Sequence, residues 1–201
     1  MEPVFRRRAA LRGAAVLAAG AAVPVGAAAA DEFPELTWRA TAPGASPPPF
    51  RMRLISGIPA VAGYGTVVTL GPVILQAISH PAFPLLLRDT GYSSLTATVT
   101  GAVVVTDARG LSGRVPVTID FPRVTMPTVA TATVLTGTAT LTGSPQLPAV
   151  RNPGRMTIKV EPGAKGAVTV FKDNGASNSF SSTLTLYPPT QNPLVATIEV
   201  R

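Results

Sequence analysis

The pattern of apolar and polar residues predicts β-strands along most of the chain after Phe50. In residues 95–100 apolar side chains alternate with threonine, and in residues 115–121 they alternate with Pro116, Thr118 and Asp120. A period of two places successive side chains on opposite faces of a strand, so these segments have one buried and one solvated face. The predicted strands fall within residues 52–55, 65–70, 95–105, 115–121, 130–142, 156–160, 168–171, 180–186 and 194–200.

Three local signals refine these strands. Pro116 has no N–H to donate, which predicts that its strand lies at or near a sheet edge. In residues 130–142 the apolar positions change from even to odd numbers, which predicts a bulge or sharp bend between Val134 and Gly137. Residues 173–175, Asp-Asn-Gly, predict a tight turn between two strands.

One apolar stretch, from Val73 to Asp89, shows no alternation and is interrupted by two prolines. Residues 85–91 predict a single helical turn closed by Gly91, so this stretch reads as a crossover carrying a short helix. Short strands, many turns and one crossover predict an all-β fold over residues 51–201. Its expected form is an immunoglobulin-like two-sheet β-sandwich of about eight or nine strands.

The first 50 residues predict two segments before this domain. Residues 1–30 have a basic start, an uncharged Ala-rich stretch and a run of small residues, as in a cleaved signal peptide. The Arg7-Arg8 pair favours twin-arginine export, with an ordinary secretory signal or a retained anchor as the alternatives. Residues 31–50 are Pro-rich and read as a linker, in which Trp38 is expected to pin the segment onto the core, with a binding side chain as the alternative.

Composition and charge narrow the class of protein. The chain has no cysteine, which excludes disulfides, thiol nucleophiles and cysteine-ligated zinc. Without residues 1–30 the formal charge falls from +7 to +4, because 13 basic side chains remain against 9 acidic ones. These charges are spread thinly and aromatic residues make up 5% of the chain, so we expect no nucleic-acid binding.

Candidate chemistry is sparse, and we assign no catalytic, cofactor-binding or metal-binding residue and expect no enzyme. His80 is the single histidine, and its neighbour Ser79 cannot readily present a hydroxyl to it. The acidic candidates for glycosidase chemistry are scattered along the chain: Asp89, Asp107, Asp120, Glu161 and Asp173. Asp107 and the turn at 173–175 could supply calcium ligands, but each fits a plain turn.

Rows of threonine at 96–100, 131–133 and 136–142 suggest a hydroxyl-rich sheet face. Such a face could hydrogen-bond a glycan or order water as ice-binding proteins do. The simpler interpretation is a solvated face built from residues that favour strands.

Three segments resemble a family of secreted actinobacterial immunoglobulin-like β-sandwich domains that have no assigned activity. They are residues 85–101, LLLRDTGYSSLTATVTG; residues 115–119, VPVTI; and residues 187–198, YPPTQNPLVATI. The resemblance covers most of residues 51–201 and implies the sandwich fold, but no functional residue. Similar domains carry two cysteines, where this chain has Met52 or a neighbour and Tyr187.

Together these signals predict a secreted, non-enzymatic domain that binds a cell-envelope polymer or an extracellular surface protein. The alternative is a structural module that recruits another secreted protein by pairing at a sheet edge. A hydrolase is the third reading. A concave aromatic strip would favour sugar binding, but Tyr64, Tyr92 and Tyr187 are too far apart in the sequence to predict one.

Overall fold

Eleven strands and one helix make up the part of the chain that the computed structural model describes, which is residues 34–41, 47–66, 68, 70–141 and 152–201. The predicted signal peptide lies outside these residues. The elements are β1 (Leu36–Thr41), β2 (Phe50–Ser56), β3 (Val61–Ala62), β4 (Val73–Ile78), α1 (Phe83–Asp89), β5 (Ser94–Thr106), β6 (Ser112–Thr125), β7 (Val134–Leu141), β8 (Gly154–Val160), β9 (Ala164–Phe171), β10 (Ser177–Leu186) and β11 (Leu194–Val200).

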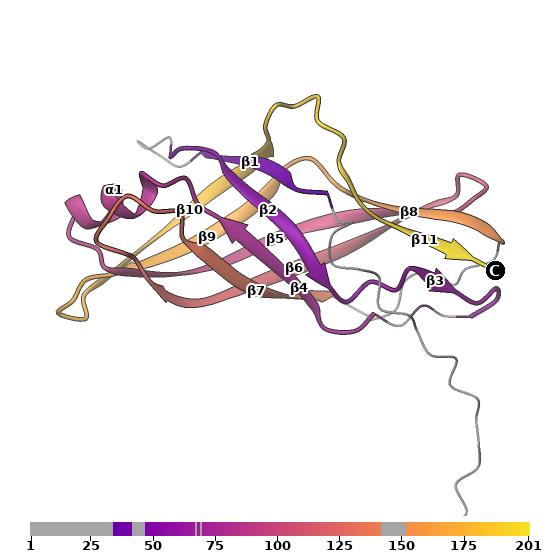
Figure 1. The fold of residues 1–201 in the computed structure, drawn as a ribbon, viewed down its shortest axis with the longest axis horizontal. Coiled ribbons are helices and arrows are strands. Elements are labelled where there is room, and N and C mark those ends of the chain that lie inside the picture. Colours follow the sequence, from indigo (N-terminus) through magenta and orange to yellow (C-terminus); the bar gives the residue numbers. More distant parts are fainter. Residues whose placement is uncertain (1–33, 42–46, 67, 69, 142–151) are drawn as a thin grey trace, which may run out of the picture.

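Eight of the strands close into a barrel (Figure 1). Around the barrel the order is β1, β2, β4, β7, β6, β5, β9 and β10, and every neighbouring pair is antiparallel. The ring closes between β10 and β1, where Trp38 pairs with Leu186. The prediction of an immunoglobulin-like two-sheet sandwich, which the resemblance also implied, is therefore wrong. Both architectures bury one face of each strand, so alternation along the chain does not distinguish them.

The remaining strands extend the barrel at one end (Figure 1). The 13-residue strand β5 pairs through residues 94–100 with β9 and through residues 103–106 with β8. Strand β11 pairs antiparallel with β8, and the two-residue β3 pairs parallel with β11. The long strand β5 thus belongs to the barrel over its first half and to this extension over its second.

Apolar side chains form two clusters. The first, which we call the barrel core, fills the barrel and includes Leu36, Trp38, Phe121 and Val170. The second, which we call the second core, lies under the extension and includes Met156, Ile158, Ile198 and Val200. Leu75, Ala139 and Val195 pack against both clusters, so the two cores are continuous.

The predicted short helix is confirmed as α1. It ends at Asp89, with Thr90 as the C-cap, and Gly91 follows with a φ of 83°, a backbone conformation that residues with a Cβ rarely adopt. Phe83 and Leu87 of the helix pack against the barrel core. Figure 1 shows α1 at the end of the barrel opposite the extension. Residues 73–78, predicted as part of the crossover, instead form β4 between β2 and β7. Their outward residues Ile74 and Ile78 are apolar and half-buried, which hid the alternation.

Several local predictions are corrected by the strand pairing. Strand β7 begins at Val134 and pairs with β4 in continuous register to Ala139, so the predicted bulge is replaced by a loop before the strand. The register shifts occur elsewhere, one of them between Leu54 and Ser56. Strand β6 is not an edge strand, although Pro116 lies just before its first described pair with β7. The turn at 173–175 is confirmed between β9 and β10.

The segment predicted as a linker also contains a strand. Residues 36–41 form β1, which lies between β2 and β10 in the barrel. Trp38 is buried in the barrel core, as expected of an anchor, but it is anchored by strand pairing. Residues 42–46 of the Pro-rich stretch and residues 67 and 69 of the predicted strand 65–70 lie outside the described residues.

Candidate functional site: an apolar cavity in the barrel

A partly open cavity of about 110 Å³ lies among the barrel strands. Each of the eight barrel strands contributes at least one lining residue, and β8 and β11 of the extension add Ile158, Val160 and Val195. The lining therefore joins the barrel core to the second core. Most of these side chains are aliphatic, and Arg53 and Glu161 are the charged residues among them.

Small residues that face inward on three of the barrel strands help to leave this space open. Gly101 on β5, Ala139 on β7 and Ala164 on β9 all line the cavity. A Cβ added at Gly101 would come within 3.2 Å of the Ala164 Cβ, so these two residues lie side by side on the paired strands β5 and β9. Larger side chains here would fill the interior, as they do in fully packed small barrels.

The charged residues of the lining are already paired. The Glu161 carboxylate accepts hydrogen bonds from Arg114 Nε, at 3.0 Å, and from Arg114 Nη2, at 2.8 Å. These bonds lower the pKa of Glu161 below its ordinary value of 4.5 and raise that of Arg114. Arg53 donates from Nε and Nη2 to Gln76 Oε1 on the neighbouring strand β4. The charged groups therefore have partners of their own, and the wall is apolar in character.

Trp38 is the aromatic residue of the lining and holds a donor without a partner. Its side chain is 5% exposed, and its Nε1 finds no hydrogen-bond acceptor among the described residues. The main chain beside it is firmly held, because Gln191 Oε1 accepts from Thr37 N at 3.1 Å and Gln191 Nε2 donates to Thr37 O. The strand that carries the indole is thus tied to the loop between β10 and β11.

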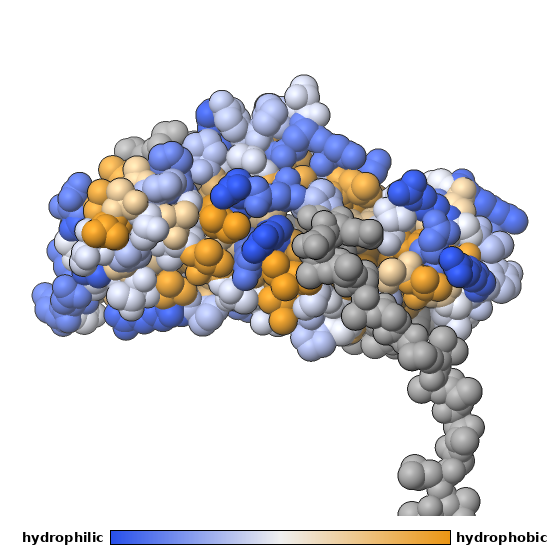
Figure 2. All heavy atoms as spheres, viewed as in Figure 1, coloured by the Kyte–Doolittle hydropathy of each residue, from blue (hydrophilic) through white to orange (hydrophobic). Residues whose placement is uncertain are grey.

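Hydrophobic and hydrophilic side chains both occur on the outer surface. Figure 2 shows hydrophobic side chains in separate patches between strongly hydrophilic ones on one face of the molecule. On the outer face of the barrel, strand register aligns Thr140, Thr118 and Thr100 across β7, β6 and β5. Thr98 Oγ1, in the next row, donates to Asp120 at 2.8 Å. The threonines at 96–100 and 136–140 therefore lie in β5 and β7, whereas Thr131 and Thr133 belong to the loop before β7 and residue 142 lies outside the described residues.

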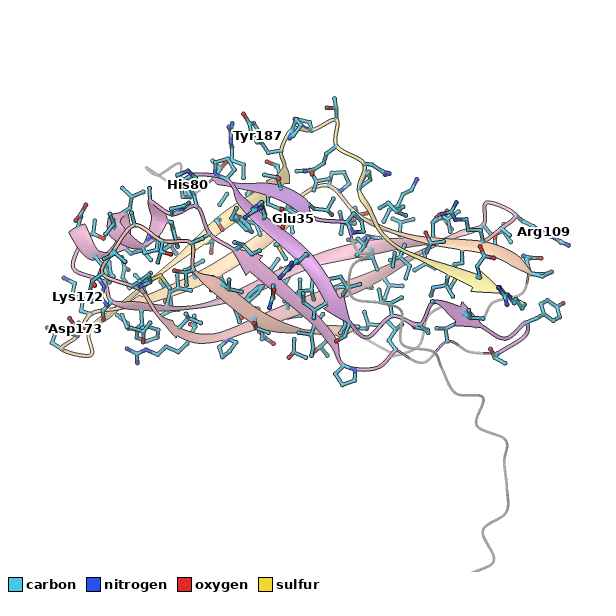
Figure 3. The ribbon with its side chains drawn as sticks, viewed as in Figure 1. Glu35, His80, Arg109, Lys172, Asp173 and Tyr187 are labelled. Atoms are coloured by element: carbon cyan, nitrogen blue, oxygen red, sulfur yellow. The ribbon has the colours of Figure 1, made fainter. Side chains whose placement is uncertain are left out.

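Ser79 and His80 have structural roles. Ser79 Oγ accepts from Thr133 N at 3.0 Å, and Ser79 N donates to Thr133 O at 2.9 Å. His80 lies in the exposed loop before α1, where its Nδ1 accepts from Ala82 N at 3.2 Å (Figure 3). Each side chain thus stabilises a neighbouring backbone segment, and the two do not hydrogen-bond to each other in the way a nucleophile and its base would.

The carboxylates predicted from the sequence lie apart. Asp107 closes its turn by accepting from Arg109 N and Leu111 N, and its Oδ2 accepts from Asn152 Nδ2 at 2.6 Å. The bond from Asn152, with the two main-chain bonds, lowers the pKa of Asp107. Asp173 is 85% exposed at the tip of the β9–β10 hairpin (Figure 3). Across the described ranges no three acidic or histidine side chains gather as a metal site would need.

The three tyrosines lie on different parts of the molecule. Tyr187, at the end of β10, stacks under the Arg39 guanidinium at 3.8 Å (Figure 3). Tyr92 follows α1 and packs against the barrel core, whereas the Tyr64 main chain bonds to the C-terminal Arg201. They form no aromatic strip of the kind that binds sugars.

None of the family models, curated proteins or solved structures with which the chain was compared matches it. The resemblance to secreted actinobacterial domains therefore stays a prediction. Among the helices of the described residues, none has the length and apolar character needed to span a membrane.

The sequence did not predict the cavity, because the small residues at 101, 139 and 164 that line it are far apart in the sequence and are brought to one cavity by strand pairing.

Proposed function

We propose that this chain is a non-enzymatic binding protein that holds one small apolar molecule inside its barrel. The observation that carries the proposal is the aliphatic cavity of about 110 Å³, to which all eight barrel strands contribute. Barrels of eight strands are wide enough either to be filled by their own side chains or to hold a small ligand. Here small residues at inward positions leave room for the ligand.

The size of the cavity sets the size of the ligand. An engineered apolar cavity of about 150 Å³ stays dry and binds benzene or xenon. A cavity of about 110 Å³ accordingly suits a compact molecule no larger than benzene, with at most about six heavy atoms. Filling it with such a molecule would restore the dispersion contacts that the lining side chains lack.

Benzene is a direct probe, and the single tryptophan is a built-in reporter, because Trp38 lines the cavity. We expect saturable quenching or shift of Trp38 fluorescence and a rise in the unfolding temperature that grows with benzene concentration. Ala139→Leu places a larger side chain in the cavity and should abolish both effects. Thr138→Leu is the matched control, because Thr138 is exposed on the outer face of the same strand.

Two results would contradict the proposal. One is the absence of saturable binding by wild-type protein over the solubility range of benzene. The other is equal binding by wild type and by an Ala139→Leu protein whose circular dichroism and cooperative unfolding match those of wild type. Gly101→Ala, which adds one methyl group facing Ala164, serves as a milder filling variant if Ala139→Leu does not fold.

The sequence-based prediction of a cell-envelope polymer or surface protein as partner stays a prediction. It is tested by sedimenting the chain with isolated envelope material across a salt series, since binding that survives high salt is specific. The alternative, strand addition at a sheet edge, has weaker support, because each barrel strand has partners on both sides. The open edge of the described sheet lies in the extension, where β3 pairs with Glu199 and Val200 of β11 and leaves the rest of that side of β11 without a described strand partner.

A further inference from the structure

Three arginines lie on the outer face of the barrel, Arg39 on β1 and both Arg51 and Arg53 on β2. Alternate residues of these strands pack in the barrel core, so the arginines between them face outward. The strands pair with Thr37 opposite Arg51, which places Arg39 on the diagonal from Arg51 at about 7–8 Å. Arg53 follows Arg51 by two residues, or about 7 Å along the strand. The three residues form a line along the strands, which we call the arginine row.

Two members of the arginine row are held in place by hydrogen bonds to neighbouring side chains. Arg51 Nη1 donates to Glu35 Oε1 at 3.0 Å. Arg53 donates to Gln76 Oε1 from Nε at 3.1 Å and from Nη2 at 2.8 Å. These bonds use part of the five N–H donors that each guanidinium carries. The groups are thus partly pre-oriented, and each keeps donors for a further partner.

The row carries more positive charge than its surroundings neutralise. Glu35 is the carboxylate that contacts it within the described residues, whereas Gln76 is neutral. Strands β10, β1, β2 and β4, which lie side by side here, contain no acidic residue. Figure 2 shows strongly hydrophilic side chains over β1 and β2 on the face turned to the viewer. Three arginines and one glutamate leave a formal charge of +2 on this face, which attracts anions.

We propose that the arginine row binds a linear polymer with phosphate groups repeated along its chain, a second binding function that is independent of the cavity. Guanidinium groups bind phosphate oxygens through paired N–H donors. The ends of the row, Arg39 and Arg53, are separated by about 14 Å along the strand direction, or four residue rises. A single small anion therefore reaches part of the row, whereas a chain of phosphates running along the strands neutralises all of it.

A nucleic acid fits this face less well than a polymer without bases. Tyr187 is the aromatic side chain that contacts the row, and the Arg39 guanidinium covers its ring at 3.8 Å from the centroid. Single-stranded nucleic acids bind through bases stacked on free aromatic rings as well as through their phosphates. The face offers charge without such a stacking platform, which favours a polymer recognised by its phosphates alone.

Inorganic polyphosphate is the probe, and calorimetry across a salt series measures its affinity. Arg39→Gln combined with Arg51→Gln should weaken binding at least about tenfold, because two charge-assisted contacts are lost. The slope of log affinity against log salt should fall by about 1 to 2, since fewer counterions are released. Arg155→Gln combined with Lys159→Gln is the matched control. It removes the same charge from exposed positions on β8 and should weaken binding less than about threefold.

Three results would overturn this proposal. The first is the absence of polyphosphate binding by wild-type protein at low salt. The second is equal weakening by the two double variants, which would mean that overall charge alone is sensed. The third is tighter binding of a single-stranded DNA oligonucleotide or of anionic lipid vesicles than of polyphosphate at equal phosphate concentration. All four substitutions lie on the surface, and the unfolding temperature of each double variant confirms that it is folded. Benzene binding is measured separately, so this proposal and the proposed function can fail independently.

Discussion

At the scale of single residues, the Glu161–Arg114 pair ties the turn between β8 and β9 to strand β6. Its two hydrogen bonds lower the pKa of Glu161 from the ordinary value of 4.5. A carboxyl group with a lowered pKa in the folded state stabilises the fold above its ordinary pKa, and this contribution is lost as the pH falls through the lowered value. The pair therefore contributes at neutral pH and not in strong acid.

The corresponding prediction concerns Glu161→Gln. Its urea midpoint should lie below that of wild type at pH ~7, and the gap should close when the pH falls well below the ordinary pKa of 4.5. Urea titrations across this range measure it. In an Arg114→Met background the same substitution should give a gap that does not vary with pH, because the partner is absent. If the difference between the urea midpoints of wild type and Glu161→Gln stayed constant down to pH ~2, the stabilising role of the Glu161–Arg114 pair would be contradicted.

The sequence revealed residue types but few residue roles. Glu161 was recognised as one of several scattered carboxylates, but its partner Arg114 lies 47 positions away and is brought near only by the fold. Asn174 in the turn at 173–175 shows the opposite case, because its side chain accepts from a main-chain N–H two positions ahead, and local turn chemistry was enough to predict the turn. Asp107 combines the two: it accepts from main-chain N–H groups of its own turn and from Asn152, 45 positions away, and only the turn could be predicted.

At the scale of the elements, β7 shows why its pattern misled. Its inward residues are Leu135, Gly137, Ala139 and Leu141, a clean alternation that begins at Val134. The apolar residues Ala130 and Ala132 belong to the preceding loop, and reading them as strand produced the apparent change of phase. Where an alanine-rich loop adjoins a strand, hydrophobicity alone does not locate the boundary between them.

Gly137 gives the prediction at this scale. It faces inward against Phe121, and a Cβ there would lie 2.7 Å from Phe121 Cδ1 and 2.9 Å from the Asp120 carbonyl oxygen. Since one of these atoms is backbone, Gly137→Ala should force β6 and β7 apart and lower the free energy of unfolding by about 1–3 kcal/mol. Thr138→Ala, on the exposed face of β7, should stay within about 0.5 kcal/mol of wild type. Equal urea midpoints for the two variants would contradict this packing.

At the scale of the whole molecule, alternation predicted an all-β chain correctly but not its closure. Trp38 and Leu186 complete the ring although they lie at opposite ends of the described chain, and nothing in either segment alone indicates the pairing. Closure also creates the interior in which Gly101, Ala139 and Ala164 meet. The cavity is thus a property of the assembled ring, and no motif in the sequence could have indicated it.

The same geometry predicts that barrel and extension unfold as one unit. Strand β5 runs through both, and Leu75, Ala139 and Val195 pack against both cores. Ile198 lies in the second core with 0% exposure, whereas Trp38 lies in the barrel core. Ile198→Ala should therefore lower stability by about 2–5 kcal/mol and move the Trp38 fluorescence transition in urea as far as the circular dichroism transition.

Glu199→Ala is the control for this experiment, because Glu199 is the exposed neighbour of Ile198 on β11. It should leave both transitions within about 0.5 kcal/mol of wild type. If Ile198→Ala moved the circular dichroism transition and left the Trp38 transition in place, the extension would unfold separately from the barrel. Coincident movement instead means that packing beneath β11 supports the ring holding Trp38, so a molecule bound in the cavity should stabilise the extension as well.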